Sequence, residues 1–298
     1  MHMITDAAKG AVGAPLQMLE RRAAAAREMR SSGRDVEFIR RQLPTVEAAM
    51  RYFAPEVRHA ERLPATGPVL VVGNHSGLFY MPDMWITAAA LVHRRGLDAP
   101  AFGLGYDLLF AIPGVESVIR RFGALPASGQ AAEQALAEDA AVLVYPGGDW
   151  EACRPWTQRN RVDLHGRTGF VRLALRTGAA VVPVVAHGAH HSVMVLTRGE
   201  GIARTLGLDR LRVKVMPFLV GVPFGVAPVV LPPLPLPTKV TVDFLDAHDW
   251  SSDGPAAADD PRLVQERYDE VAEALQAGLD TLAAERPHPL LSRFGLAR

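Results

Sequence analysis

Short apolar runs alternate with longer amphipathic stretches through the middle of this chain. The apolar runs have the length and residue types of buried strands and lie at Pro68–Gly73, Ala141–Tyr145, Ala180–Ala186 and Lys239–Phe244. The stretches between them have the period of helices and lie at residues 84–95, 129–138 and 167–177. This order predicts an α/β fold whose central mixed, mostly parallel sheet is flanked by helices.

Two further regions adjoin the α/β domain, which we place at residues 56–250. Residues 1–55 are expected to form an amphipathic helical region that either packs on the core or lies on a membrane surface. Residues 251–298 are expected to contain a polar linker at 251–261 and a final amphipathic helix at 262–285.

Composition excludes several classes of protein. Lys plus Arg and Asp plus Glu both total 32, so no net field attracts nucleic acid, and we expect no nucleic-acid partner. The single cysteine, Cys153, excludes an internal disulfide framework and suits a reducing compartment. The N-terminus lacks the basic and apolar regions of a secretory signal, which predicts a cytoplasmic location.

The segment Met216–Thr238 carries no charge and contains seven prolines. It is long enough to cross a bilayer, but each proline removes a backbone donor and interrupts a helix, so a spanning helix is not expected. Two interpretations stay open for this segment. It is either a buried irregular connection between strands or an apolar lip that contacts a membrane or an acyl chain.

A histidine follows the first apolar run directly, in "VLVVGNHSGLFYMPDMW". Chemistry in open α/β sheets collects where strands end, and His75 stands at such an end. Neutral imidazole is the natural general base near neutral pH, and a carboxylate that fixes its tautomer assists it. Asp83 is the nearest such carboxylate in the sequence, although a structural role for His75 explains the same pattern.

Two later segments carry further polar residues that converge on a ligand in one interpretation. In "VYPGGDWEACRPW" the glycines Gly147 and Gly148 let backbone amides approach a ligand, and Glu151 and Arg154 follow. Arg167 lies at the start of the next helical stretch, where it either binds an anion or belongs to a solvated helix face.

Taken in order, these elements resemble the glycerolipid acyltransferase superfamily. The resemblance covers about residues 45–250 and rests on four segments: "LPATGPVLVVGNHSG", "IRRFGALPAS", "VYPGGDWEACRPW" and "AAVVPVVAHG". It implies that His75 is the catalytic base and Asp83 its orienting partner. It also implies a substrate-binding role for residues of the second and third segments, for which we expect Arg120, Ser128, Gly147, Gly148, Glu151, Arg154 and Arg167.

Three departures from the family pattern bear on the substrate. Seven residues separate His75 from Asp83, where the family has four. The family's glutamate and arginine of the third segment are replaced by Gly147 and Trp150, and its arginine of the second segment by Ser128. The third segment is thereby closest to the branch that contains mono- and diacylglycerol acyltransferases.

The resemblance predicts an O-acyltransferase that moves a fatty acyl group from acyl-CoA or acyl carrier protein to the hydroxyl of a lysophospholipid or acylglycerol. The thioester is then a co-substrate, and we expect no cofactor and no metal. Such a protein works at a membrane surface, which predicts a peripheral location on the inner face of the membrane. Two alternatives remain: a non-catalytic lipid-binding protein on the same fold, and a metal-dependent hydrolase that uses His187, His190 and His191.

Overall fold

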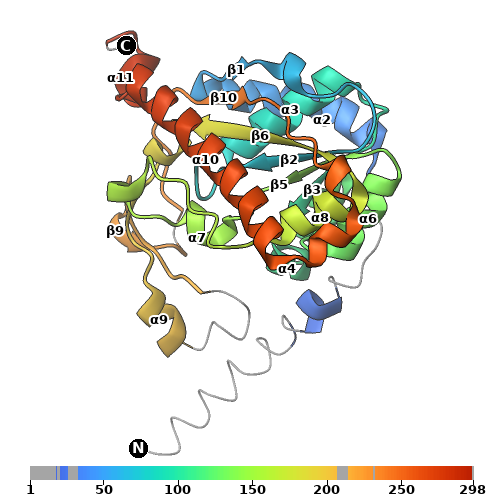
Figure 1. The fold of residues 1–298 in the computed structure, drawn as a ribbon. Coiled ribbons are helices and arrows are strands. Elements are labelled where there is room, and N and C mark those ends of the chain that lie inside the picture. The colour runs from blue at the N-terminus through green and yellow to red at the C-terminus, as the bar shows by residue number, and fades with distance from the viewer. Residues whose placement is uncertain (1–17, 19–20, 26–32, 207–213, 231, 297–298) are drawn as a thin grey trace, which may run out of the picture.

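The computed structural model describes residue 18 and residues 21–25, 33–206, 214–230 and 232–296. A seven-stranded sheet forms its centre, in the order β1-β10-β6-β2-β5-β3-β4 (Figure 1). All neighbouring pairs run parallel except β10 and β6. The predicted α/β fold with a mixed, mostly parallel sheet is confirmed.

The four apolar runs form the strands near the middle of this sheet. They are β2 (Val69–Gly73), β5 (Ala141–Val144), β6 (Ala180–His187) and β10 (Thr241–Phe244). The strands that the sequence analysis did not identify are β1 (Glu56–Arg58), β3 (Ala101–Gly105) and β4 (Ala124–Pro126). These three lie at or near the edges of the sheet.

Helices cover both faces of the sheet. The predicted helical stretches are α3 (Pro82–Arg95), α6 (Gly129–Ala137), α8 (Gly169–Thr177) and α10 (Pro261–Glu285). Shorter helices that were not predicted are α4 (Asp107–Ala111), α5 (Val115–Arg121), α7 (Gly148–Ala152), α9 (Glu200–Thr205) and α11 (Pro289–Arg293). Helix α2 (Val36–Met50) belongs to the N-terminal region.

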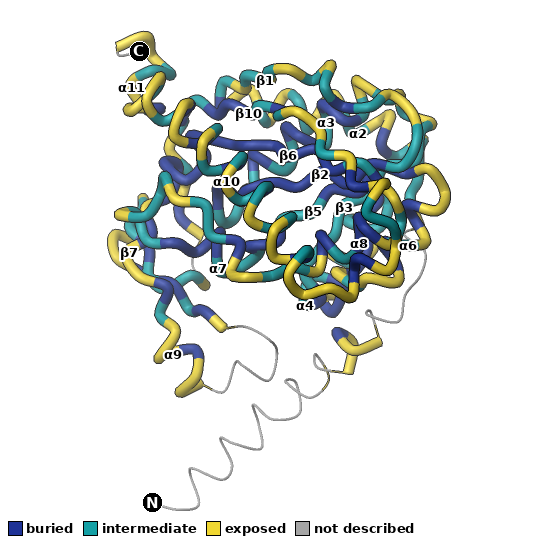
Figure 2. Tube along the Cα trace, viewed as in Figure 1, coloured by how far each residue is buried: buried dark blue, intermediate teal, exposed yellow. Residues whose placement is uncertain are grey.

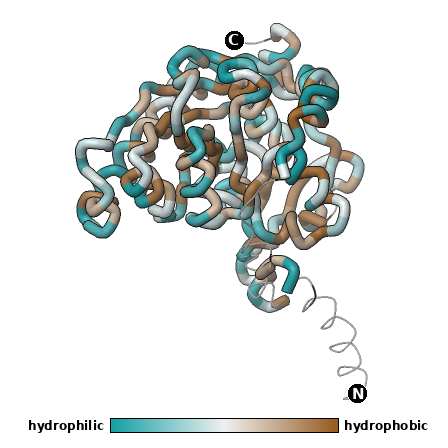
Figure 3. The backbone as a smooth tube through the Cα atoms, turned by 90° about the vertical axis from the view of Figure 1, so that its right-hand side faces the viewer, coloured by the Kyte–Doolittle hydropathy of each residue, from teal (hydrophilic) through white to brown (hydrophobic). Residues whose placement is uncertain are grey.

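Alternate side chains of the central strands serve two separate cores. In β2, Leu70 and Val72 pack with α6, α8 and α10, whereas Val69 and Val71 pack with α3 and Phe53. Side chains on successive residues of a strand point to opposite faces, so a strand covered on both sides must be apolar throughout. Figure 3 shows the most hydrophobic stretches inside the molecule and hydrophilic stretches toward its outside.

Two of the expected terminal features can be compared with the structure. Part of the predicted N-terminal helical region lies outside the described residues. In the described part, α2 is a helix that is capped by Asp35, whose Oδ1 accepts a hydrogen bond from the Phe38 N–H. The expected polar linker at 251–261 contains two short 3-10 helices instead, Ser251–Asp253 and Pro255–Asp259. Ala257 and Ala258 of the second are buried in the core beside α8, so this segment is packed.

The uncharged segment Met216–Thr238 takes part in a second, smaller sheet. Strands β7 (Met194–Thr197), β8 (Phe218–Gly221) and β9 (Gly225–Pro228) are antiparallel, in the order β7-β8-β9. Figure 2 shows that much of this sheet is exposed, so a fully buried connection is not what the chain forms here. Among the described residues, no helix is both long enough and apolar enough to cross a membrane.

Candidate active site

The residues that follow β2, β5 and β6 meet at the carboxyl end of the central sheet. Asn74, directly after β2, is buried, and its side chain substitutes for a backbone peptide. Its Nδ2 donates to the Ala186 carbonyl at 3.0 Å, and its Oδ1 accepts from the Ala186 N–H at 2.7 Å. Because both polar atoms of the Asn74 side chain bond to β6, they hold the chain beside that strand directly before His75.

His75 and Asp83 are in direct contact. Nδ1 of His75 lies 2.9 Å from Oδ2 of Asp83, which also accepts the Ser76 N–H at 2.9 Å. The seven intervening residues form a loop, and Asp83 stands in the first turn of α3, where the helix dipole favours a negative charge. The Asp83 side chain has no exposed surface, whereas that of His75 is 11% exposed. The Asp83 contact at Nδ1 leaves Nε2 of His75 as the ring nitrogen for a reacting proton.

The surroundings of His75 make its imidazole more basic. Burial on its own lowers the pKa of His75, but the charge and hydrogen bond of Asp83 and the nearby Glu151 carboxylate raise it above its ordinary value of 6.5. A carboxylate at one ring nitrogen stabilises the imidazolium that forms when the other nitrogen takes a proton. The pair has the geometry of a general base and its orienting acid.

Tyr145, directly after β5, forms one wall of the site. Its ring stacks on the His75 imidazole with centroids 4.8 Å apart and planes 26° apart. The ring occupies the space of a side chain at Gly73, since a Cβ there would lie 2.4 Å from the tyrosine ring. Glycine at position 73 therefore lets Tyr145 hold the imidazole plane from one side.

Glu151 and Arg154 hold the backbone of His75, and this corrects the substrate-binding role expected for them. Oε2 of Glu151 accepts the His75 N–H at 2.7 Å, and the Arg154 guanidinium donates to the His75 carbonyl at 2.8 Å. Both residues are completely buried, with 3.4 Å between guanidinium nitrogen and carboxylate oxygen. Arg154 donates further to the carbonyls of Glu151 and Arg159. Without exposed surface, neither residue reaches a substrate in this structure.

Gly147 makes room for Glu151 of this buried pair, and Gly148 makes room for Arg167. A Cβ on Gly147 would lie 2.5 Å from the Glu151 side chain, and one on Gly148 would lie 2.6 Å from the Arg167 guanidinium. The Gly148 N–H donates to the Tyr145 carbonyl at 3.0 Å, so the expectation of a free donor to a ligand is wrong for Gly148. Arg167 bonds to the carbonyls of Pro146 and Gly147 and to the Asp149 carboxylate, and thereby fastens the turn.

Arg120 and Ser128 lie on other elements. Arg120 pairs with Glu116 one turn earlier in α5, at 2.9 Å. The Ser128 hydroxyl caps α6 by accepting the Ala131 N–H. Arg121, beside Arg120, pairs with Asp35 and lies over the Phe38 ring, so it holds α2. A substrate-binding role for Arg120 and Ser128 stays a prediction.

The histidines after β6 do not form a metal site. Among the residues that the structure describes, no group of three or more His, Cys, Asp or Glu side chains is arranged to hold a metal ion. His190 donates from Nε2 to the Arg154 carbonyl at 2.8 Å, while burial lowers the pKa of His187 to about 4 and of His191 to about 3. Cys153 is buried, which raises its thiol pKa to about 12 and leaves it a poor nucleophile.

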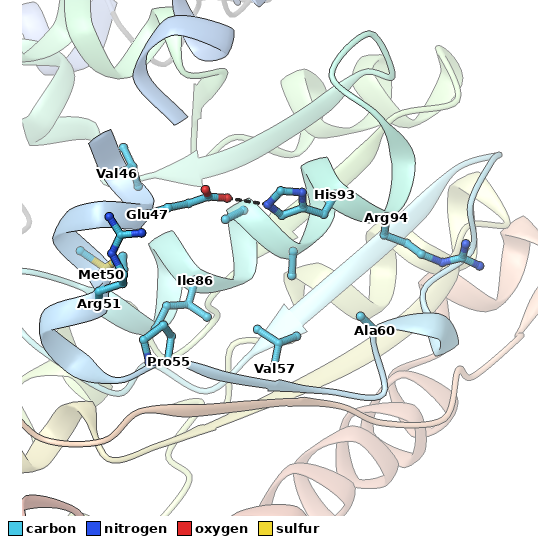
Figure 4. A pocket seen from close by; sticks show the side chains of 12 residues that line it. Val46, Glu47, Met50, Arg51, Pro55, Val57, Ala60, Ile86, His93 and Arg94 are labelled. Carbon is cyan, nitrogen blue, oxygen red and sulfur yellow. Dashed lines mark hydrogen bonds and ion pairs between the residues drawn. The ribbon is translucent and has the colours of Figure 1, made fainter. Parts of the chain in front are cut away.

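A separate apolar groove of about 490 Å³ lies between α2 and α3 (Figure 4). Ile86 and Ala90 of α3 contribute to it, and the Glu47–His93 ion pair lies across it. Its lining residues include neither His75 nor Asp83, which is why we place the chemistry at the sheet end and not in this groove.

Comparisons with known proteins agree with the fold and the order of the motifs. The acyltransferase family model matches residues 54–187, which include β2, His75, Asp83 and the Pro-Gly-Gly turn. These residues match the acyltransferase family. The fold of the chain resembles the crystal structure of the 1-acyl-sn-glycerophosphate acyltransferase from Thermotoga maritima. That match has a TM-score of 0.51 and 19% identity, and covers 83% of this chain and 80% of the other.

Known proteins match this chain over only part of their own length. An uncharacterized protein of Mycobacterium leprae is 31% identical over 79% of this chain, which spans 62% of that protein's length. Phytyl ester synthase 2 of Arabidopsis thaliana is 34% identical over 43% of this chain and 18% of its own length. Human 2-acylglycerol O-acyltransferase 3 is 39% identical over 27% of this chain and 24% of its own length.

Three residues of the site have no role in the sequence-based prediction: Asn74, which bonds to β6, Ser76, whose N–H donates to Asp83, and Tyr145, which stacks on His75. The prediction names His190 only as a metal ligand, whereas its N–H donates to the Ser76 hydroxyl and its Nε2 to the Arg154 carbonyl. Asn74 and Tyr145 had a detectable signal, because Asn74 directly follows an apolar run and Tyr145 is the last residue of another. Ser76 and His190 had none, since the Ser76 hydroxyl accepts the His190 N–H across two segments far apart in the chain.

Proposed function

We propose that this protein transfers a fatty acyl group from a thioester donor, acyl-CoA or acyl carrier protein, to the hydroxyl of a lipid. The observation that carries the proposal is the hydrogen bond between His75 and the buried Asp83 at the end of the central strand of an acyltransferase-family domain. The pair supplies a base whose side chain is 11% exposed and whose tautomer Asp83 fixes.

In this mechanism Nε2 of His75 takes the proton of the acceptor hydroxyl while its oxygen attacks the thioester carbonyl carbon. The new ester bond forms as the carbon–sulfur bond breaks, and the imidazolium returns its proton to the departing thiolate. Asp83 stabilises the imidazolium meanwhile, in the role that a buried carboxylate plays beside other catalytic histidines. No covalent acyl-enzyme and no cofactor take part.

The acceptor we propose has an uncharged or weakly charged head, such as an acylglycerol or a lysophospholipid diester. A phosphomonoester dianion is usually bound by arginine, but the second-segment position is Ser128 and the third is Trp150. Arg154, a possible substitute, is buried and committed to backbone carbonyls, and Arg121 is held by Asp35. The names of two relatives refer to a phytyl ester and to 2-acylglycerol, and neither name mentions a phosphate.

The acceptor preference can be tested with acyl-CoA and a panel of acceptors. We expect kcat/KM to be higher for monoacylglycerol or a lysophospholipid diester than for lysophosphatidic acid, since that ratio reports binding of the transition state. A preference for lysophosphatidic acid of more than about tenfold would contradict this choice of acceptor. In that event Arg120→Ala, in the second segment, would show whether that side chain has replaced the missing contacts.

The pH dependence of the reaction tests the role of Asp83. As the base, His75 must be neutral, so kcat/KM should fall as the pH drops through its raised pKa. Asp83→Asn removes the charge that raises this pKa, so the acid limb should move to lower pH and the plateau should fall. Asp149→Asn is the matched control, because Asp149 pairs with Arg167 and not with His75. If the acid limb of the kcat/KM profile does not move in Asp83→Asn, Asp83 is not the partner that we propose for His75.

A further inference from the structure

The small sheet β7-β8-β9 is apolar on both of its faces. Its inner row is Val195, Leu219 and Ala227, which are register partners and buried. Leu78 and Phe79 pack against this row, and they belong to the loop between His75 and Asp83. The inner face therefore adjoins the loop that joins His75 to Asp83.

The outer row of the same sheet consists of Met194, Val220 and Val226, which are also register partners. Met194 is 37% exposed and Val226 is 64% exposed. A sheet with one buried face normally carries polar residues on the other, so an apolar outer face needs a separate explanation.

Exposed apolar residues are concentrated around this sheet. Among the described residues, half of the twenty exposed large hydrophobic residues fall within residues 194–236: Met194, Leu196, Ile202, Leu206, Val222, Phe224, Val226, Val230, Leu234 and Leu236. We call the outer sheet face and the adjoining residues 222–230 and 232–236 the apolar face. A concentration of exposed apolar residues of this kind usually marks an interaction surface.

The backbone of the apolar face is suited to an apolar environment. The pairing of β8 with β9 satisfies some of its backbone hydrogen-bonding groups. In addition, the Leu234 N–H donates to the Val222 carbonyl, and the Leu236 N–H donates to the Ser192 carbonyl. The prolines carry no N–H, which reduces the number of donors that would need water. In hydrocarbon every unpaired backbone donor is costly, so a paired, charge-free segment enters it most easily.

Two tyrosines border this segment. The Tyr80 hydroxyl donates to the Pro233 carbonyl at 3.0 Å, and the Tyr52 hydroxyl donates to the Pro235 carbonyl at 2.7 Å. Both side chains are partly exposed, Tyr80 by 36% and Tyr52 by 45%. Tyrosine is enriched at the boundary between membrane and water, because it combines an apolar ring with a polar tip.

We infer that the apolar face is the surface by which this protein docks on a lipid bilayer, with the β8-β9 hairpin inserted among the lipids. The inference that docking delivers a lipid hydroxyl to His75 rests on the proposed function; the docking itself does not. Docking here places the membrane against the same small sheet that the dyad loop packs on, so an acceptor leaves the bilayer next to the base.

Vesicle co-sedimentation tests the docking surface without any substrate. The full chain is incubated with neutral phosphatidylcholine vesicles, and with vesicles that also contain an anionic lipid. We expect binding to the neutral vesicles, and we expect Val226→Glu to lower the partition coefficient at least about tenfold, since an inserted valine is replaced by a charge. Val222→Glu, at a residue 60% exposed in the hairpin turn, is a second variant should the first fail to fold.

Val57→Glu is the matched control. Val57 is 43% exposed on the edge strand β1 and lines the groove between α2 and α3. The Val57→Glu variant should bind vesicles as strongly as the unaltered chain does. The inference fails if the chain binds neither kind of vesicle, or if only Val57→Glu loses binding, which assigns the lipid to the groove. The inference also fails if sedimentation shows that the unaltered chain is a dimer and that Val226→Glu only dissociates this dimer. A chain that binds vesicles but transfers no acyl group would refute the proposed function alone.

Discussion

Replacing His75 with alanine is expected to lower kcat for acyl transfer by about 10²–10⁴-fold, the usual contribution of a general base. The attacking hydroxyl then has no group to take its proton, while the surfaces that bind donor and acceptor are unchanged. The loss should therefore appear in kcat, with KM for the thioester nearly constant. Initial rates measured over a range of acyl-CoA concentrations separate the two parameters.

His93→Ala is the matched control for this experiment. His93 is an exposed histidine at the far end of α3, where it pairs with Glu47. Its removal should leave kcat within about twofold, because exposed ion pairs contribute little and the reaction lies elsewhere. If a folded His75→Ala retains activity to within about tenfold of the original, the dyad is not the catalytic base, and a lipid-binding protein becomes the better description.

Arg154→Met is expected to lower the free energy of unfolding by about 3–5 kcal/mol, the cost of removing one partner of a buried ion pair. Glu151 would remain buried with its counter-charge gone, and the carbonyls of His75 and Arg159 would lose their donor. Burial already raises the pKa of Glu151 against the influence of Arg154, so without the arginine this carboxyl is expected to be protonated more readily. Urea unfolding followed by circular dichroism measures the loss.

Arg167→Met provides the comparison, because Arg167 pairs with Asp149 in the adjacent turn but is 38% exposed. Its loss should cost under about 1 kcal/mol. In the double variant Glu151→Gln with Arg154→Met, the destabilisation should be smaller than the sum of the two single values, since each single change strands the other group. Equal effects for Arg154→Met and Arg167→Met would mean that the buried pair does not hold the site together.

The central strands were predictable because burial on both faces leaves little freedom in their residues. All five residues of β2 are buried, and its sequence Val-Leu-Val-Val-Gly follows from that. The edge strand β1 is only three residues long and includes Glu56 and Arg58, which gives it no apolar run. Strands β8 and β9 of the small sheet are only four residues long and begin or end with glycine or proline, whose preference for strands is weak. Their pairing depends on contacts between distant segments.

The site was predictable only where a single loop forms it. His75 and Asp83 lie in one strand–loop–helix unit, so Asp83 is the nearest carboxylate in the sequence, and the family resemblance then implies the pair that the structure forms. The direction in which Glu151 and Arg154 point depends on how α7 packs behind β2, more than seventy residues away in the chain. Sequence shows the charge of such residues but not their burial, and we therefore assigned them to the substrate.

The length of the loop between the two dyad residues does not set their contact. His75 is fixed by β2, Asn74 and the buried pair, and Asp83 by the first turn of α3, so neither depends on the length of the loop that joins them. The three residues beyond the family's usual spacing do not alter the 2.9 Å contact. Leu78 and Phe79 in the loop meet the small sheet instead. In this chain the contact between His75 and Asp83 and the packing of the loop on the small sheet thus depend on different residues.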